Sequence, residues 1–354
     1  MSGNLAAATR LPDLPFLDAL RGLLIVFVVG IHAGSYAQLP SGWQLDVTMF
    51  VVSTATVKCF FLVDGFLLAR SLEKPVQPAA LSRLQASTTR LLLPWLLFSA
   101  IYLLLRMYGA RLGMLPPASM PEGHWSFTGA VSALWYSETS AQMYFLVSLF
   151  AVRVVAIACH ALLQRCGASA LALMAIALAL LFRMAVEPWA LAANPRSVMD
   201  PLLLALGGSA FFVAGMAMWR ARWHEFPQRL ALAVALLLVS IAATRIEAGW
   251  GRAASEFGYS AALFLVFAML AGMPAWLAAM GRRTMGIYLL HLPIIMHLVT
   301  SLIHRLAGAS GFPAYFLIVP LTALASLLTV LVCEHLGVAA RLFGETRVAV
   351  RAQA

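Results

Sequence analysis

Charged side chains are scarce in this sequence. Asp, Glu, Lys and Arg together make up 11% of the 354 residues, whereas 62% are apolar, and the mean hydropathy is +0.88. A soluble globular chain is typically about 25% charged and about 45–50% apolar. The composition therefore argues against an ordinary soluble domain and indicates a membrane protein.

Cysteines are few, and the common catalytic motifs are missing. Four cysteines do not make a disulfide-rich secreted scaffold. The sequence has no phosphate-binding P-loop, no dinucleotide-binding glycine fingerprint, no His-Glu-x-x-His or Cys-x-x-Cys motif and no nucleophile elbow. Its eight histidines are scattered without the spacing of a metal site. We therefore expect neither a bound metal nor a tightly bound cofactor.

Long apolar runs are what the chain does have. A bilayer core of roughly 30 Å requires about 20 mostly apolar helical residues, and short polar or Pro/Gly-containing joins separate windows of that kind. They predict an all-α polytopic membrane protein, about ten transmembrane helices in one bundle. The domain would cover 16–335, between an N-terminal tail (1–15) and a C-terminal tail (336–354). The predicted spans are 16–37, 47–69, 90–108, 142–163, 169–186, 201–219, 229–246, 257–277, 284–304 and 314–335.

The basic residues predict the orientation of these spans. The net charge is +10, and positively charged short loops stay on the cytoplasmic side of a membrane. If the N-terminus is inside, the inner segments hold most of the Arg and Lys. We therefore expect both termini to be cytoplasmic. On a membrane chain the basic excess marks loops and does not indicate nucleic-acid binding.

The first span carries three ionisable residues, Asp18, Arg21 and His32. Such a residue inside a span costs roughly 2.5–3.5 kcal/mol on insertion scales, so each one is a functional-site hypothesis. Arg21 and His32 are separated by almost three helical turns, which places them on one helix face about 16 Å apart in depth. Asp18 lies one turn before Arg21 and approximately shares that face. An arginine that reaches the interface and a histidine satisfied by a neighbouring helix are the structural alternatives.

Other ionisable residues occur along later spans. Lys58 and Asp64 point to different sides of the second span, so an Arg21–Asp64 or a Lys58–Asp18 pair is open to them, and interhelical ion pairing is at least as good an explanation as catalysis. Arg83 and Arg90 precede the third span, where they are either topology signals or groups that grip phosphate. Sequence gives no partner for two further arginines within spans, Arg153 and Arg183.

Several segments resemble a known family in the expected order. Phe16-Leu-Asp-Ala-Leu-Arg21-Gly22 followed by an apolar run to His32 is similar to the opening of the bacterial acyltransferase family 3 membrane proteins. Further matching segments are Phe60-Phe61-Leu-Val-Asp64-Gly65-Phe66, Arg83 and Arg90 with Leu93-Pro94-Trp95, Tyr144-Phe145-Leu146, Met285-Gly286-Ile287-Tyr288-Leu289-Leu290-His291, and Glu334. Two positions depart from the family pattern: Asp64 replaces a usual Ser, and Leu93-Pro94-Trp95 lacks a second Pro.

The resemblance implies a multi-pass protein of the bacterial cytoplasmic (inner) membrane that transfers an acyl group, most often acetyl. The donor would be a cytoplasmic acyl-CoA, and the acceptor a hydroxyl of a cell-surface or periplasmic glycan or glycolipid. His32 would act as general base or, alternatively, form an acyl-His32 intermediate. Arg21 would orient the donor, and Arg83 and Arg90 would bind its phosphates. The charges within the spans and the resemblance together give as further candidates Asp18, Lys58, Asp64, Tyr144, His291 and Glu334.

Intramembrane charges also suit an ion-coupled transporter or a lipid or glycan flippase. The sequence lacks the two similar halves and the matched Gly/Pro-broken helices that many transporters carry. A structural membrane subunit whose charges only join helices is the third interpretation. The lipid bilayer is an expected partner in all three cases, and the sequence is silent on the oligomeric state.

Overall fold

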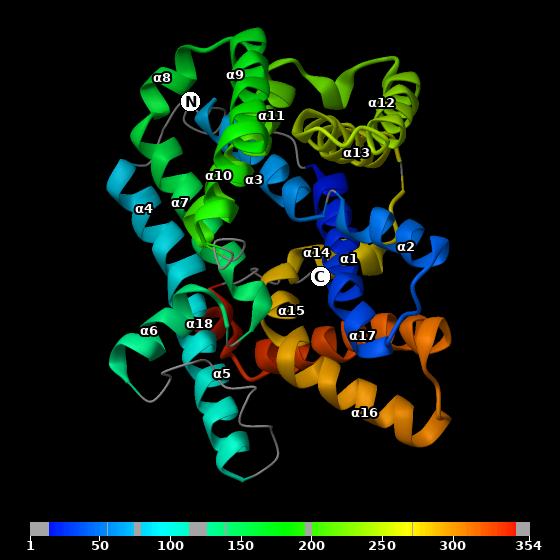
Figure 1. Cartoon of the computed structure of the whole chain (residues 1–354). Helices are drawn as coiled ribbons and strands as arrows, with labels where there is room; N and C mark the ends of the chain where they lie inside the picture. The colour runs from blue at the N-terminus through cyan, green and yellow to red at the C-terminus, as the bar shows by residue number, and fades with distance from the viewer. Residues whose placement is uncertain are drawn as a thin grey trace, which may run out of the picture.

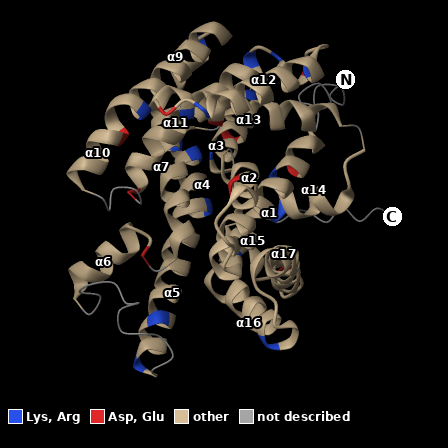
Figure 2. Ribbon diagram, turned by 45° about the vertical axis from the view of Figure 1, so that its right-hand side comes forward, with Lys and Arg blue, Asp and Glu red and all other residues tan. Residues whose placement is uncertain are grey.

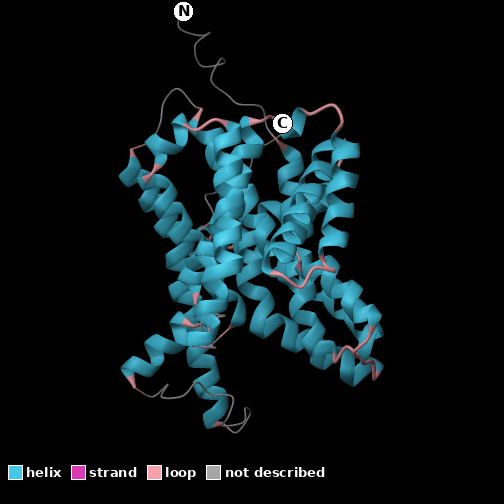
Figure 3. Ribbon diagram, turned by 45° about the horizontal axis from the view of Figure 1, so that its top comes forward, coloured by secondary structure: helices cyan, strands magenta, loops and turns pink. Residues whose placement is uncertain are grey.

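The structure of the protein is a computed structural model that describes residues 14–54, 56–73, 79–112, 126–138, 140–194, 200–270 and 272–344. Within these ranges every regular element is a helix (Figure 3). The all-α prediction is therefore confirmed for the described part of the chain. Residues 1–13 of the predicted N-terminal tail and 345–354 of the predicted C-terminal tail lie outside it.

The helices pack side by side in one bundle (Figure 1). Short π-helical or 3-10 segments, labelled η, join several of them into longer rods. In chain order the elements are α1 (Pro15–Ala37), α2 (Trp43–Ser53), α3 (Thr56–Leu72), α4 (Ala80–Ser87), η1 (Thr88–Leu92), α5 (Leu93–Arg111), α6 (Phe127–Trp135), η3 (Ala141–Met143), α7 (Tyr144–Ala158), α8 (His160–Arg165), α9 (Ala168–Leu181), η4 (Phe182–Val186), α10 (Glu187–Ala193), α11 (Pro201–Arg220), η6 (Trp223–Glu225), α12 (Arg229–Ala243), α13 (Gly249–Met269), α14 (Ala275–Arg282), α15 (Thr284–Leu290), η7 (His291–Ile295), α16 (Met296–Ala307), α17 (Gly311–His335) and α18 (Ala339–Phe343).

Eight helical rods in the described residues are long and apolar enough to cross a membrane, so this test supports fewer spans than the ten predicted. The predicted span 229–246 corresponds to α12, which has only 15 residues. The predicted span 257–277 is misplaced, because α13 runs from Gly249 to Met269. Its first half buries Ser255 and Glu256, and these polar residues lower the local hydropathy. The predicted span therefore began and ended eight residues later in the chain than α13 does.

Helix α1 runs through both halves of the bundle. We call the half in which α1 begins the near half, and the half in which it ends the far half. In the near half, the ring of Phe264 lies 5.4 Å from that of Phe16 and 4.9 Å from that of Phe66. Phe66 in turn contacts Trp219, with 5.1 Å between ring centroids. The last turns of α3 and α11 therefore meet the first turn of α1.

Glycines allow the central helices to approach one another closely. A Cβ on Gly22 of α1 would collide with the carbonyl oxygen of Leu277, and one on Gly281 of α14 would collide with that of Asp18. The same relationship joins α3 to α11, where Gly65 faces the backbone of Phe212. Small residues at such crossings are typical of membrane helix pairs, which gain van der Waals contact and not hydrophobic burial.

Three rods contain a π-helical segment: η1, η4 and η7. A π-helical turn holds an extra residue and changes the direction in which the following side chains point, and such segments occur frequently at functional sites. In this chain they carry Arg90, Arg183 and His291 respectively. Two of these residues were candidates from the sequence.

Candidate active site

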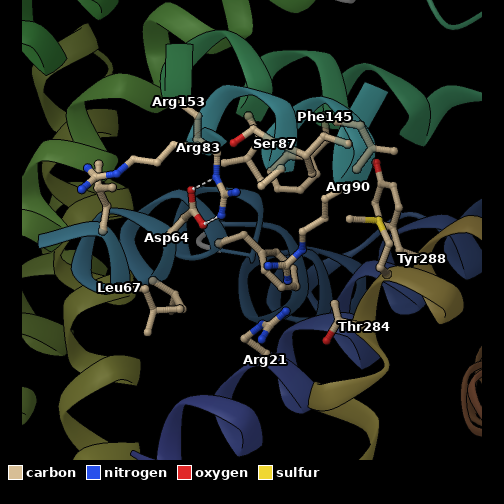
Figure 4. A pocket seen from close by; sticks show the side chains of 18 of the residues that line it. Arg21, Asp64, Leu67, Arg83, Ser87, Arg90, Phe145, Arg153, Thr284 and Tyr288 are labelled. Atoms are coloured by element: carbon tan, nitrogen blue, oxygen red, sulfur yellow. Dashed lines mark hydrogen bonds and ion pairs between the residues drawn. The ribbon is translucent and has the colours of Figure 1, made fainter. Parts of the chain in front are cut away.

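A cavity of about 420 Å³ opens in the near half of the bundle. Its walls come from α1, α3, α4 with η1, α7 and α15 (Figure 4). Four arginines line it, and Asp64 is the one carboxylate among the described lining residues. The arginines are Arg21, Arg83, Arg90 and Arg153. The structure thus brings together Arg21, Arg83 and Arg90, which the sequence proposed as donor-binding groups.

Asp64 of α3 forms a two-pronged ion pair with Arg153 of α7 (Figure 4). The Nε of Arg153 donates to Oδ2 at 2.7 Å, and Nη2 donates to Oδ1. The Arg21–Asp64 pairing, which the sequence left open, is therefore not the one observed. The sequence could not identify Arg153 as the partner because the two residues lie 89 positions apart on separate helices. The described lining holds four arginines and one carboxylate, so its formal charge is positive and the cavity favours an anion.

Asp18 lies beside Arg21 at the start of α1. One of its oxygens is 3.8 Å from Nη1 of Arg21, and the other is 3.9 Å from Nη1 of Arg282. Both distances are at the long end for ion pairs, and the Asp18 side chain is 34% exposed, so each contact contributes little energy. Asp18 is thus a partner of Arg21, one turn away on the helix face that the two were expected to share.

His32 and His291 form a pair within the bundle. Their ring centroids are 5.4 Å apart, with 42° between the ring planes. His291 is fully buried, and its Nδ1 lies 2.8 Å from the carbonyl oxygen of Tyr288. A carbonyl only accepts, so Nδ1 must carry the proton. The buried Nε2 is then an acceptor, and it has no hydrogen-bond partner among the described residues.

Tyr288 connects the cavity with the histidine pair. It lines the cavity, and its ring centroid is 6.0 Å from that of His291. Its hydroxyl donates to the carbonyl oxygen of Gln142, whose side-chain amide donates to the carbonyl of Leu292 at 3.1 Å. The histidines themselves are not part of the described lining. Gln142 was missed from the sequence, where its one signal was its position two residues before Tyr144.

A second, smaller cavity of about 160 Å³ contains Lys58 and Tyr144. Lys58 pairs with Glu256, with 3.2 Å between Nζ and Oε1. The Lys58–Asp18 pairing, which the sequence left open, is not the one observed. Arg183 of η4 donates to Glu256 and, at 2.6 Å, to Glu187. Three helical rods meet in this cluster, so interhelical ion pairing is confirmed for Lys58. Glu256 was not identified from the sequence, because the predicted span 257–277 began one residue after it.

Glu334 closes a different contact. Its two oxygens accept from Nε and Nη2 of Arg283, each at 2.9 Å. This two-pronged pair joins the end of α17 to the junction of α14 and α15. Glu334 belongs to the described lining of neither cavity, so its position indicates a structural anchor.

The model of the acyltransferase 3 family, described as an acyltransferase domain, matches residues 14–333. The chain belongs to this family. No curated protein and no solved structure matches it. The protein is therefore an acyltransferase with membrane-spanning helices, and the resemblance seen in its first span extends over nearly the whole chain.

The acyltransferase combines two chemical devices. The near-half cavity offers arginines that match the geometry of phosphate or carboxylate groups. The histidine pair offers imidazole nitrogens that can donate or accept hydrogen bonds. Metal ligation has no support in the described residues, since no group of three or more His, Cys, Asp or Glu could hold an ion there.

Proposed function

We propose that this acyltransferase moves a short acyl group, most simply acetyl, from acyl-CoA on the cytoplasmic side to a hydroxyl of a cell-surface or periplasmic glycan or glycolipid. The near half of the bundle would then face the cytoplasm of a bacterium, in its inner membrane. The observation that carries the proposal is the cavity with four arginines, joined through Tyr288 to the His32–His291 pair.

The donor would bind with its phosphates in the near-half cavity. Coenzyme A carries several phosphate charges on an adenosine head and a long, slender pantetheine arm that ends in the thioester. Arg83 and Arg90 would hold the phosphates, and Arg21 would orient the arm. His32 lies eleven residues beyond Arg21 on α1, about 16 Å along the helix axis. An extended pantetheine arm spans such a distance.

His32 would act as the general base. In the first step, the acceptor oxygen attacks the thioester carbonyl carbon while His32 takes the hydroxyl proton, which gives a tetrahedral oxyanion. In the second step, the oxyanion collapses, the carbon–sulfur bond breaks, and the thiolate leaves with the proton from His32. His291 would be a positioning residue. Its Nε2 faces no other described partner and would accept a hydrogen bond that fixes the orientation of His32, directly or through water. An acyl-His32 intermediate formed by direct attack of the imidazole is the mechanistic alternative.

Acetyl-CoA labelled in its acetyl group, given to inverted membrane vesicles, tests the proposal. Covalent label on glycan or glycolipid is the expected result, and its loss in His32→Ala and Arg21→Ala at normal insertion supports the assigned roles. His297→Ala is the matched control, because His297 lies on the exposed side of α16. Solute accumulation without covalent label would favour the transporter alternative, and full labelling by His32→Ala would remove His32 as the base.

A further inference from the structure

The second cavity lies in the far half of the bundle. It is lined by the first turns of α3, by the first half of α11, by the starts of α7 and α13, and by the η4 region. Because α3 and α11 end in the near half, their first turns lie on the opposite side. The two cavities therefore occupy opposite halves of the protein.

Consecutive residues divide the cavities from each other. Phe60 lines the near-half cavity and Phe61 the far-half one; on α7, Phe145 lines the near-half cavity and Tyr144 the far-half one. The ring of Phe145 lies 5.8 Å from that of Phe60 and 5.3 Å from that of Phe61. We call Phe60, Phe61 and Phe145 the aromatic partition. Its presence makes the second cavity a separate site and not an extension of the first.

The charges of the second cavity balance. Its lining holds two cations, Lys58 and Arg183, and two anions, Glu187 and Glu256, and Figure 2 shows basic and acidic segments where α3, α11 and α13 meet. A charged ligand would upset this balance in a setting of low dielectric. A neutral ligand with groups that both donate and accept hydrogen bonds fits it.

One atom of the cluster is left without a protein partner. The Glu256 side chain is 7% exposed, and its Oε1 receives both Lys58 and Arg183. Its buried Oε2 accepts from no group in the described part of the chain. A buried carboxylate oxygen without a donor is costly, so this oxygen calls for a donor from a ligand or from water inside the cavity.

Apolar rings form the rest of the wall. Phe61, Phe182 and Phe211 line the cavity. A Cβ on Gly207 would lie 2.7 Å from the ring of Phe182, and one on Gly208 would lie 2.6 Å from that of Phe61. The two glycines thus let both rings approach α11 closely. A wall that combines aromatic faces with charged hydrogen-bonding groups suits a sugar, which has apolar C–H faces and a rim of hydroxyl groups.

The π-helical segment η4 adds an independent observation. The other two π-helical segments carry Arg90 of the near-half cavity and His291 of the histidine pair. The third carries Arg183, which reaches both carboxylates of the second cavity. All three irregular segments therefore place a polar side chain at a proposed or candidate site.

We infer that the second cavity binds one neutral sugar ring of the acceptor, with Glu256 Oε2 accepting a hydrogen bond from a ring hydroxyl. This inference rests on the proposed function, since it supplies an acceptor subsite for that reaction. A volume of about 160 Å³ is close to that of a cavity of about 150 Å³ that holds one benzene ring, so it admits a single ring and excludes a longer oligosaccharide. The remaining units of the acceptor would stay outside the cavity.

Equilibrium binding of tritium-labelled methyl glycosides to the protein in lipid nanodiscs tests the inference without any acyl transfer. Methyl glucoside, galactoside, mannoside and rhamnoside would be compared on the wild type, Glu256→Gln and Ala253→Leu. Glu256→Gln replaces one carboxylate oxygen by an amide donor, and Ala253→Leu fills the cavity, because Ala253 lines it. Glu334→Gln is the matched control, since it alters a comparable ion pair outside both cavities.

Binding of at least one glycoside, weakened tenfold or more in both test variants and unchanged in Glu334→Gln, is the expected result. Lack of binding by all four glycosides, or equal binding by all variants, overturns the inference and leaves the proposed function standing if labelled acetyl still reaches glycan. Glu256-dependent binding without any acetyl transfer would instead refute the proposed function and leave a sugar site. If the Glu256→Gln protein inserts poorly, glycoside binding to Ala253→Leu tests the inference, because that variant keeps all four charges.

Discussion

The ring of His291 lies 5.4 Å from the ring of His32, and only one nitrogen of His291 is committed to the backbone. Nδ1 donates to Tyr288, whereas Nε2 is buried without a described partner. His32 comes from α1 and His291 from the π-helical segment η7. The pair therefore joins the best candidate of the first span to a residue about 260 positions later in the chain.

Two amide variants separate the roles of the His291 nitrogens. His291→Asn keeps a donor near the Nδ1 position, and His291→Gln keeps a polar atom near the Nε2 position. If Nε2 orients His32, His291→Asn should lower kcat about 10–100-fold, less than the loss of a general base, and shift the pH profile of kcat/KM. His291→Gln should retain more activity. Equal losses with an unchanged pH profile would mean that His291 acts only in packing.

Arg83→Gln and Arg90→Gln should each raise the KM for acetyl-CoA about tenfold or more while kcat changes little, because a charge-assisted hydrogen bond to phosphate contributes about 1.5–3 kcal/mol. Acetyl-pantetheine lacks the nucleotide phosphates, so its KM should hardly change. Kinetics with both donors measure this difference. Arg305→Gln, at the exposed end of α16, is the control; a similar rise for both donors would contradict phosphate binding.

The Asp64–Arg153 pair predicts a coupled effect on stability. Both side chains are mostly buried, at 12% and 23% exposed, so Asp64→Ser should destabilise the protein by about 2–3 kcal/mol by leaving Arg153 without its carboxylate. Asp64→Ser combined with Arg153→Met should recover much of that loss. Thermal unfolding of the two single variants and the double variant gives the coupling energy. Additive effects would show that the pair contributes little.

Close packing of α1 against α14 makes Gly281 sensitive to substitution. Gly281→Val should lower the melting temperature, because added side-chain atoms would collide with the backbone of Asp18 and overpacking typically costs about 1–3 kcal/mol. Gly167→Ala is the control, since a Cβ there meets no atom within 4 Å. Equal melting temperatures for both variants would show that the helices separate easily.

Local patterns predicted much of the fold. The first span was expected over 16–37, and α1 runs from Pro15 to Ala37, because a long apolar run fixes a membrane helix almost without regard to its neighbours. The joint position of Arg21, Arg83 and Arg90 followed from their order and from the family resemblance. The span 257–277 failed because the polar buried residues of α13 are satisfied by other helices, which hydropathy does not detect.

The ion-pair partners of the charged residues could not be predicted from the sequence. Lys58 binds Glu256, and Asp64 binds Arg153, each across two helices that are distant in the chain. Spacing along one helix predicts contacts only three or four residues apart, the separation of Asp18 and Arg21. Pairing between helices depends on their relative rotation, and the π-helical segments change that rotation without leaving a clear sequence signal.

The aromatic partition bears on the energetics of the host cell. A bundle hollowed from both halves would short-circuit the membrane potential if its hollows joined, since moving one elementary charge across 100 mV releases about 2.3 kcal/mol. Phe60, Phe61 and Phe145 stand between the two cavities and offer no charge or hydrogen-bonding group to a passing ion. We expect these rings to block the passage of ions between the cavities, so Phe145→Ala should make vesicles that contain the protein leak protons.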